Sequence, residues 1–143
     1  MKHASMMKPL LTVLALAACT QYAFAATDSL PPVQHQGDIA FLSGGIGLSE
    51  STAIKDAMHR YPLTIEFAGT GHSGNVYLAN VPVEIYDLHG HTVLKTTAAG
   101  PFLLASLPDG QYRVTARYNG KDESREVQIS PSAHVHEFYL WSM

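Results

Sequence analysis

Apolar and polar residues alternate with a period of two from Val76 to the C-terminus, and this pattern constrains the fold more than any other feature. A period of two places successive side chains on opposite faces of a β-strand. Turn-forming residues interrupt the pattern, most clearly at Pro108-Asp109-Gly110 and at Asn119-Gly120. The sequence predicts about six or seven short strands in an antiparallel β-sandwich over residues 71–143.

A single helical pattern precedes this region. Ser49 and Glu50 suit the start of a helix. Apolar residues then recur at the spacing of one helix face, and Pro62 ends the pattern. A short apolar run lies on each side of it. We therefore predict a strand-helix-strand appendage over residues 38–70, packed with the sandwich as one unit in a mainly β protein.

The hairpin at Asn119-Gly120 allows two registers. A two-residue loop pairs Val114 with Arg125, whereas a four-residue loop pairs Val114 with Val127. Because the two-residue loop places charged side chains on the face that must be buried, we predict the four-residue loop. The predicted core then has Tyr112, Val114, Val127 and Ile129 on one face, opposed by Leu103 or Leu104 and by Val83 and Ile85.

The N-terminus has the organisation of an export signal. Lys2 and Lys8 precede an apolar run over 9–18, and Ala23-Phe24-Ala25 supplies a small-x-small cleavage pattern. The run is too short to cross a bilayer, which requires about 20 apolar residues. We predict a signal peptide over 1–25, a polar linker over 26–37 and a periplasmic or secreted location.

A second processing route is open at Cys19. The run Leu16-Ala17-Ala18-Cys19 resembles the lipobox of bacterial lipoproteins, in which the cysteine is lipidated and becomes the N-terminus. That route would make the protein an outer-membrane lipoprotein, with membrane contact only through Cys19. Because Cys19 is the single cysteine of the chain, disulfides, thiol catalysis and cysteine-based zinc sites are excluded from the folded part.

Charge argues against two classes of partner. The chain carries nine lysine and arginine residues against twelve aspartate and glutamate residues, a formal net charge of −3. The basic residues are scattered along the sequence. A mildly acidic chain of this kind is not expected to bind nucleic acid or an anionic membrane surface.

One long segment resembles a known family. The run over 81–121, and above all Leu-Pro-Asp-Gly-Gln-Tyr-Arg-Val at 107–114, is similar to the carboxypeptidase regulatory-like, or transthyretin-like, domain. With Ser-Gly-Gly-Ile-Gly at 43–47 and a helix after it, the whole resembles small exported bacterial proteins of unassigned function. The resemblance implies a transthyretin-like β-sandwich and a non-catalytic role beside enzymes or outer-membrane receptors.

Two enzyme groups with a related fold match poorly. Transthyretin-like hydroxyisourate hydrolases end in Tyr-Arg-Gly-Ser, whereas this chain ends in Tyr-Leu-Trp-Ser-Met at 139–143. Intradiol dioxygenases hold iron with two tyrosines and two histidines, which His134 and His136 resemble faintly in a much shorter chain. A small transthyretin-fold enzyme is therefore the third-ranked function.

Histidines supply the second-ranked function. His89 and His91 form one His-x-His pair in a predicted turn, and His134 and His136 form another on the last predicted strand. On a strand this spacing puts both imidazoles on one face, where they favour Cu(II) or Zn(II). The alternative is that all four are surface histidines. We rank first a non-catalytic envelope protein that needs no cofactor and binds a protein partner or a small ligand, and second a periplasmic metal-binding protein.

Overall fold

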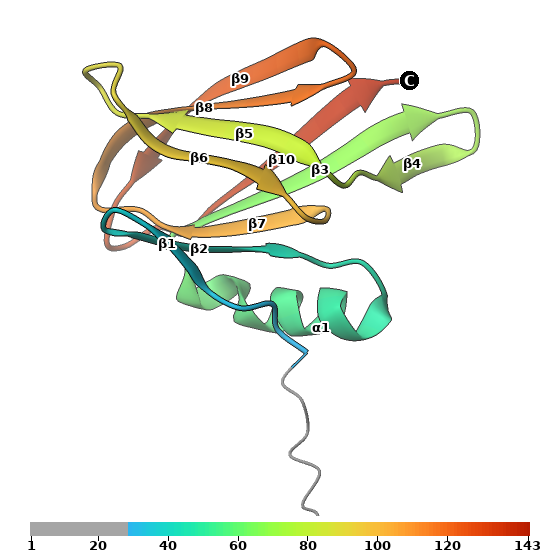
Figure 1. Cartoon of the computed structure of the whole chain (residues 1–143), viewed down its shortest axis with the longest axis horizontal. Coiled ribbons are helices and arrows are strands. Elements are labelled where there is room, and N and C mark those ends of the chain that lie inside the picture. The colour runs from blue at the N-terminus through green and yellow to red at the C-terminus, as the bar shows by residue number, and fades with distance from the viewer. Residues whose placement is uncertain (1–28) are drawn as a thin grey trace, which may run out of the picture.

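The structure is a computed structural model that describes residues 29–143. Two β-sheets pack face to face, and one helix covers the outside of one of them (Figure 1). The predicted signal peptide, the first residues of the predicted linker and Cys19 lie outside the described residues. In chain order the elements are β1 (Gln34–Gln36), β2 (Ile39–Gly44), α1 (Leu48–Ala57), η1 (Met58–Arg60), β3 (Leu63–Gly71), β4 (Gly74–Tyr77), β5 (Val81–Tyr86), β6 (Thr92–Ala98), β7 (Phe102–Ser106), β8 (Gly110–Tyr118), β9 (Lys121–Ile129) and β10 (Val135–Ser142).

The strands divide into a six-stranded sheet A and a four-stranded sheet B. Sheet A has the order β1-β2-β7-β3-β10, with β4 paired to the end of β3, and sheet B has the order β6-β5-β8-β9. Within the described residues, neighbouring strands are antiparallel except for β3 and β10, which are parallel. The predicted mainly β, antiparallel-rich sandwich is confirmed.

Segment 38–70 has the predicted order of strand, helix and strand, as β2, α1 and β3. The two strands do not pair with each other, because β7 lies between them. Strand β7 suits this central position because both of its faces are apolar. Phe102 and Leu104 point toward α1, Leu103 and Ala105 point into the sandwich, and all four are buried. The segment is therefore continuous with the sandwich.

The end of the predicted linker is a strand. Residues 34–36 form β1, which pairs with β2. Gln36 also reaches the other sheet: its Oε1 accepts a bond of 2.6 Å from Lys95 N, and its Nε2 donates one of 3.0 Å to Lys95 O. The Gln36 amide thus bonds both the N–H and the C=O of Lys95 in β6, and it links the two sheets at one side of the sandwich. The linker therefore ends before Gln34.

Helix α1 begins one residue earlier than Ser49, which is predicted as its cap. Gly47 holds the cap position and no side chain caps the helix there. Glu50 acts in the first turn as predicted, since its carboxylate favours the positive helix end and its Oε1 accepts a bond of 2.6 Å from Gly45 N. The helix passes into η1 and the chain turns extended at Tyr61, immediately before Pro62.

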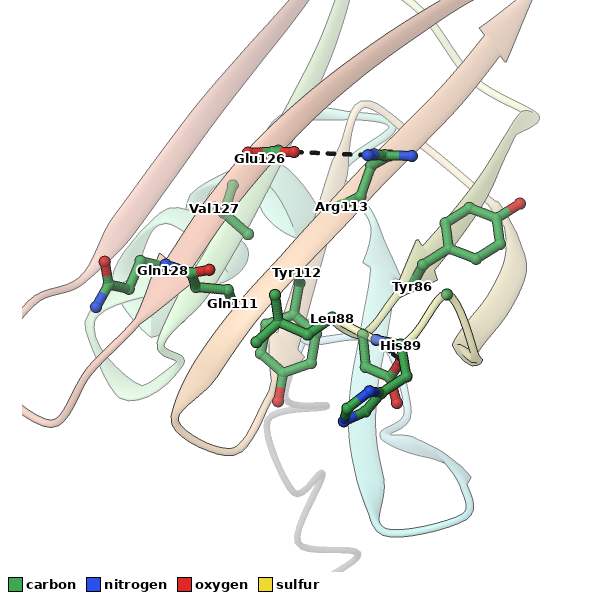
Figure 2. Close-up of a pocket in the computed structure, with 11 residues that line it drawn as sticks. Tyr86, Leu88, His89, Gln111, Tyr112, Arg113, Glu126, Val127 and Gln128 are labelled. Atoms are coloured by element: carbon green, nitrogen blue, oxygen red, sulfur yellow. Dashed lines mark hydrogen bonds and ion pairs between the residues drawn. The ribbon is translucent and has the colours of Figure 1, made fainter.

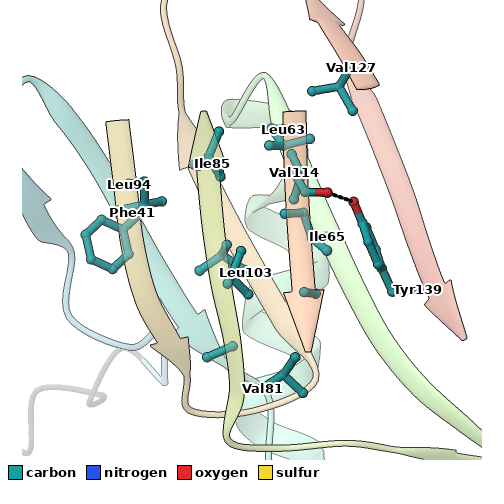
Figure 3. Close-up of a cluster of buried hydrophobic side chains, with 14 of the residues drawn as sticks. Phe41, Leu63, Ile65, Val81, Ile85, Leu94, Leu103, Val114, Val127 and Tyr139 are labelled. Carbon is teal, nitrogen blue, oxygen red and sulfur yellow. Dashed lines mark hydrogen bonds between the residues drawn. The ribbon is translucent and has the colours of Figure 1, made fainter. Parts of the chain in front are cut away.

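The inner faces of both sheets form one core. Figure 3 shows this cluster, in which the Tyr139 hydroxyl donates to Val114 O at 3.0 Å across the sandwich. A second cluster lies between α1 and the outer face of sheet A and contains Leu42, Ile54, Ala57, Phe102 and Leu104.

The predicted core residues are buried, with one change of position. Tyr112, Val114, Val127 and Ile129 share the inner face of sheet B. Leu103 faces them from sheet A. The predicted placement of Val83 and Ile85 opposite them is wrong, because β5 pairs with β8 and the two side chains lie beside Val114 in the same sheet.

The predicted register of the β8–β9 hairpin is also wrong. Tyr112 pairs with Val127 and Val114 with Arg125, across a two-residue loop. The loop residues Asn119 and Gly120 have φ angles of 48° and 73°. Positive φ at both positions is the type I′ geometry, whose twist matches that of the flanking strands.

This register turns two charges inward, Glu123 opposite Ala116 and Arg125 opposite Val114, and Arg125 finds its partners on β10. Its Nη1 donates to Phe138 O at 2.5 Å and lies 3.2 Å from Glu137 Oε2. Its guanidinium carbon lies 4.7 Å from the centre of the Tyr139 ring, a cation–π distance. The Arg125 charge is compensated at the rim of the sandwich, and Glu123, next to the hairpin loop, is only half-buried, so neither charge lies in the centre of the core.

Candidate functional site

A groove of about 690 Å³ lies at one end of sheet B, between the β5–β6 turn and the outer surface of β8 and β9. Figure 2 shows the turn in front of the strands, with Leu88 and His89 over the groove. The groove is lined by Tyr86, Asp87, Leu88, His89, Gly90, Gln111, Tyr112, Arg113, Glu126, Val127 and Gln128.

Asp87 builds the turn that forms one wall. Its Oδ1 accepts bonds from His89 N at 2.8 Å and from His91 N at 2.9 Å. Gly90 follows with a φ of 79°, which glycine adopts without strain. The backbone N–H of His91 is the main reason that the pKa of Asp87 lies below its ordinary value. The Asp87 carboxylate therefore holds the backbone of the turn in place. Leu88, in the same turn, is 71% exposed.

The floor is formed by two rows of cross-strand neighbours. In one row Tyr86 pairs with Arg113, which pairs with Glu126, and in the other Gln111 pairs with Gln128. Arg113 Nη2 lies 3.5 Å from Glu126 Oε1. The two charges compensate each other, and the floor offers donors and acceptors in close proximity.

Tyr86 lies beside Glu84, the next outward-facing residue of β5. The hydrogen bond between their side chains is the main reason that the pKa of Tyr86 is raised and that of Glu84 is lowered. Glu84 Oε1 also accepts a bond of 3.0 Å from the Thr92 hydroxyl. The ring of Tyr86 flanks the groove (Figure 2).

Tyr112 fixes the strand that runs beneath the groove. Its hydroxyl donates to Pro108 O at 2.7 Å, four residues upstream. A tyrosine bonded to the backbone just before its own strand is the arrangement called a tyrosine corner in other β-sandwiches. Burial is the main cause of its raised pKa, so the phenol stays neutral and structural. The Leu-Pro-Asp-Gly-Gln-Tyr motif thus determines how β8 enters the sheet.

The two His-x-His pairs lie in different sheets. His89 and His91 lie in the turn between β5 and β6 of sheet B with ring centres 6.1 Å apart, and His91 Nδ1 is 3.6 Å from Asp87 Oδ2. His134 and His136 lie on the outer side of sheet A, beside β3. The sequence therefore brings each pair together but does not bring the pairs to one another.

The pair beside β3 is already hydrogen-bonded. His134 Nδ1 lies 2.5 Å from Tyr61 O, which can only accept, so this nitrogen carries the proton. His134 Nε2 lies 3.4 Å from the Thr64 hydroxyl, and His136 Nε2 lies 2.9 Å from Glu66 Oε2. Over residues 29–143, no three histidine, cysteine, aspartate or glutamate residues are grouped to hold a metal ion. Copper or zinc binding stays a prediction.

Sequence reasoning did not identify the groove. Its floor comes from outward-facing residues of β5, β8 and β9, which a period-two pattern classifies only as solvent-exposed. The one available signal was the predicted turn at 88–91, because a turn that folds back over a sheet can create a concavity. Of the candidate residues, only His89 lines the groove, with His91 two residues further along the same turn.

Two further findings come from the length of the helices and from comparison with known proteins. Within residues 29–143, no helix has the length and apolar character needed to cross a membrane. No protein-family model matches the chain, and no curated protein is significantly similar to it.

Proposed function

We propose that this protein is a non-catalytic binding domain of the bacterial cell envelope, and that the groove on sheet B binds a neutral, hydroxyl-rich ligand such as an envelope glycan. The observation that carries this proposal is the chemistry of the groove floor. Its charged groups are paired or bonded to backbone, while Gln111 and Gln128 present free-standing amides beside them.

This chemistry suits a sugar better than an ion. A side-chain amide both donates and accepts, as a pair of sugar hydroxyls does, and Arg113 and Glu126 offer the same combination as a pair. The ring of Tyr86 and the exposed side chain of Leu88 supply apolar contact for the C–H face of a sugar ring. A charged ligand would have to disrupt the Arg113–Glu126 pair to find a counterion.

Two sequence features support the location and the non-catalytic role. The N-terminal pattern favours export, and the resemblance to the carboxypeptidase regulatory-like domain implies a binding or accessory task. Binding to a glycan in the envelope is the most specific function that these features jointly support.

The test is a titration of ¹⁵N-labelled protein with neutral oligosaccharides, including peptidoglycan glycan strands, and with one acidic and one basic peptide. We expect the side-chain amide signals of Gln111 and Gln128 to shift with the glycans. Replacing both glutamines with alanine should weaken binding by about tenfold for each hydrogen bond lost. Thr97→Ala, on the same face of sheet B but outside the groove, is the matched control. Shifts caused only by a peptide would refute the proposal.

Metal binding is the second candidate, favoured by the neighbouring rings of His89 and His91 in one turn, whose centres lie 6.1 Å apart. The two imidazoles offer a pair of ligands, and within residues 29–143 no third histidine, cysteine, aspartate or glutamate completes a group with them. Titration of tag-free protein with Cu(II) and Zn(II) at neutral pH tests it. Submicromolar binding lost in the His89→Ala, His91→Ala variant and retained in His134→Ala, His136→Ala would support this site. The reverse pattern would assign the metal to β10.

A further inference from the structure

The entry to α1 carries two highly exposed aliphatic side chains, one in the loop after β2 and one at the first residue of the helix. Leu48 is 84% exposed and Ile46 is 65% exposed, with only Gly47 between them. Leu48 is the most exposed large apolar side chain among residues 29–143. Single exposed aliphatic residues are common on protein surfaces, but two in one turn form a local apolar projection. We call Ile46 and Leu48 the apolar tip.

The loop that presents the apolar tip is firmly built. Gly45 has a φ of 102°, and a Cβ at this position would overlap the ring of Phe102. Its N–H is bonded to Glu50 Oε1, and Ser51 N donates to Gly47 O at 3.1 Å to begin the helix. The backbone on both sides of Ile46 is thus held against the protein, so the outward position of the tip is a property of the fold.

The described chain starts beside the apolar tip. Ser29 Oγ lies 2.8 Å from the Oγ of Ser49, the residue after Leu48, and Leu30 packs against the cluster under α1. In Figure 1 the chain arrives beneath α1, on the side of the molecule away from the β5–β6 turn. Cys19 precedes Ser29 by ten residues. A segment of that length can span at most about 35 Å, so a lipid on Cys19 would keep this side of the protein close to the bilayer.

We propose that the apolar tip inserts into the lipid surface to which Cys19 is anchored, and so orients the protein on the membrane. The proposal rests on lipidation at Cys19 and is independent of what the groove binds. Acidic residues outnumber basic ones over residues 29–143, so the contact is apolar and does not depend on anionic headgroups.

Aliphatic side chains at the boundary of headgroups and acyl chains add to the effect of an anchor. A tether also raises the local concentration of a weak second contact. This orientation directs the groove on sheet B away from the bilayer.

The experiment uses the mature chain that starts at Cys19, coupled through its single thiol to maleimide-lipid vesicles. The vesicles contain phosphatidylethanolamine, phosphatidylglycerol and brominated phosphatidylcholine. Tryptophan is introduced by Leu48→Trp or, as a matched control, by Leu88→Trp. Leu88 is also highly exposed, at 71%, but lies in the groove wall. The native Trp141 is buried and gives a constant background.

We expect the emission of Leu48→Trp to shift to shorter wavelength and to be quenched by the brominated lipid. We expect the emission of Leu88→Trp to change in neither respect. Adding Ile46→Ser to Leu48→Trp should reduce the quenching, while circular dichroism confirms that each variant is folded. Equal quenching at positions 48 and 88, or none at 48, would overturn the proposal.

Two measurements in cells complete the test. Mass spectrometry of the mature protein should find an acylated Cys19, and a free N-terminus at Ala26 would overturn the proposal. A photo-crosslinking residue at position 48 should capture lipid. Capture of one defined envelope protein in place of lipid would show that the tip is a protein contact, and would refute membrane insertion.

Discussion

The two sheets have similar inner faces and opposite outer faces. The outer face of sheet A carries Leu42, Phe102 and Leu104, all fully buried beneath α1. The outer face of sheet B carries ion pairs and hydroxyl pairs, such as Arg117 with Asp122 and Thr115 with Ser124, and no helix or strand within residues 29–143 covers it. A β-strand that is apolar on both faces needs cover on both faces, whereas an alternating strand needs it on one.

This difference explains why α1 lies where it does. The helix connects β2 to β3 and returns over β7, the strand between them, whose outward side chains it must bury. Sheet B satisfies its outward side chains by pairing across strands and leaves them in water. Its free outer face is then available for a groove, which the covered part of sheet A cannot provide.

The strongest test of the comparison is a charge placed on each outer face. Leu104→Asp buries an unpaired carboxylate under α1, at a cost of several kcal/mol, which is comparable to the whole stability of a small domain. We expect this variant not to fold. Thr97→Asp, on the exposed outer face of sheet B, should unfold near the wild-type midpoint in urea. Similar midpoints for the two variants would contradict the assignment of covered and free faces.

A less severe substitution tests the packing of α1 against sheet A. Ile54 is fully buried between α1 and sheet A, and Ile54→Ala should lower the free energy of unfolding by about 2–5 kcal/mol. Asp56→Ala, on the exposed side of the same helix near its C-terminal end, is the control. Its stability should be unchanged or slightly raised, because a negative charge at that end opposes the helix dipole. Urea denaturation of both variants measures the difference.

The smallest effect concerns the ion pairs of sheet B. Arg117 bonds to Asp122 through Nε at 2.5 Å and Nη2 at 3.0 Å, and this bonding lowers the pKa of Asp122 below 3.8. Because the folded pKa is depressed, the pair stabilises the protein above the ordinary aspartate pKa, and the contribution is lost as pH falls through the lower value. Both residues are exposed, so we expect the substitution Arg117→Gln to leave the thermal stability at neutral pH without a measurable change.

An NMR titration of the Asp122 carboxyl carbon checks this prediction. Arg117→Gln should return the midpoint to the ordinary aspartate value, whereas Arg113→Gln, in the neighbouring ion pair of the same face, should leave it low. An Asp122 midpoint that does not respond to Arg117 would remove the ion pair as the cause.

The elements of the fold were predictable because local patterns determine them. Alternation marked the strands, apolar spacing marked α1, and Pro62 marked its end. The strand over 34–36 was missed because Gln34, His35 and Gln36 are all polar. They form a strand through pairing with β2 and through the bond of Gln36 to Lys95, and both depend on residues distant in sequence.

The hairpin register shows where pattern reasoning fails. The pattern argued against the two-residue loop because that loop turns Glu123 and Arg125 inward, and it cannot show that Arg125 has partners there. Glu137, Phe138 and Tyr139 supply the partners from the other sheet. The groove escaped prediction for a similar reason, since it is formed by a turn and two strands that meet only in the folded protein. Long-range contacts decided both outcomes.

The two hydrogen bonds between the Gln36 side chain and the Lys95 backbone also determine how the protein would carry mechanical load. If the N-terminal segment is tethered and a ligand is held in the groove, tension enters through residues 29–36 and leaves through sheet B. Strand β1 alone would transmit that tension through three residue pairs with β2, and these would open one after another. The amide of Gln36 gives the load a second, direct path into β6. Pulling on the tether therefore loads both sheets together instead of peeling one from the other.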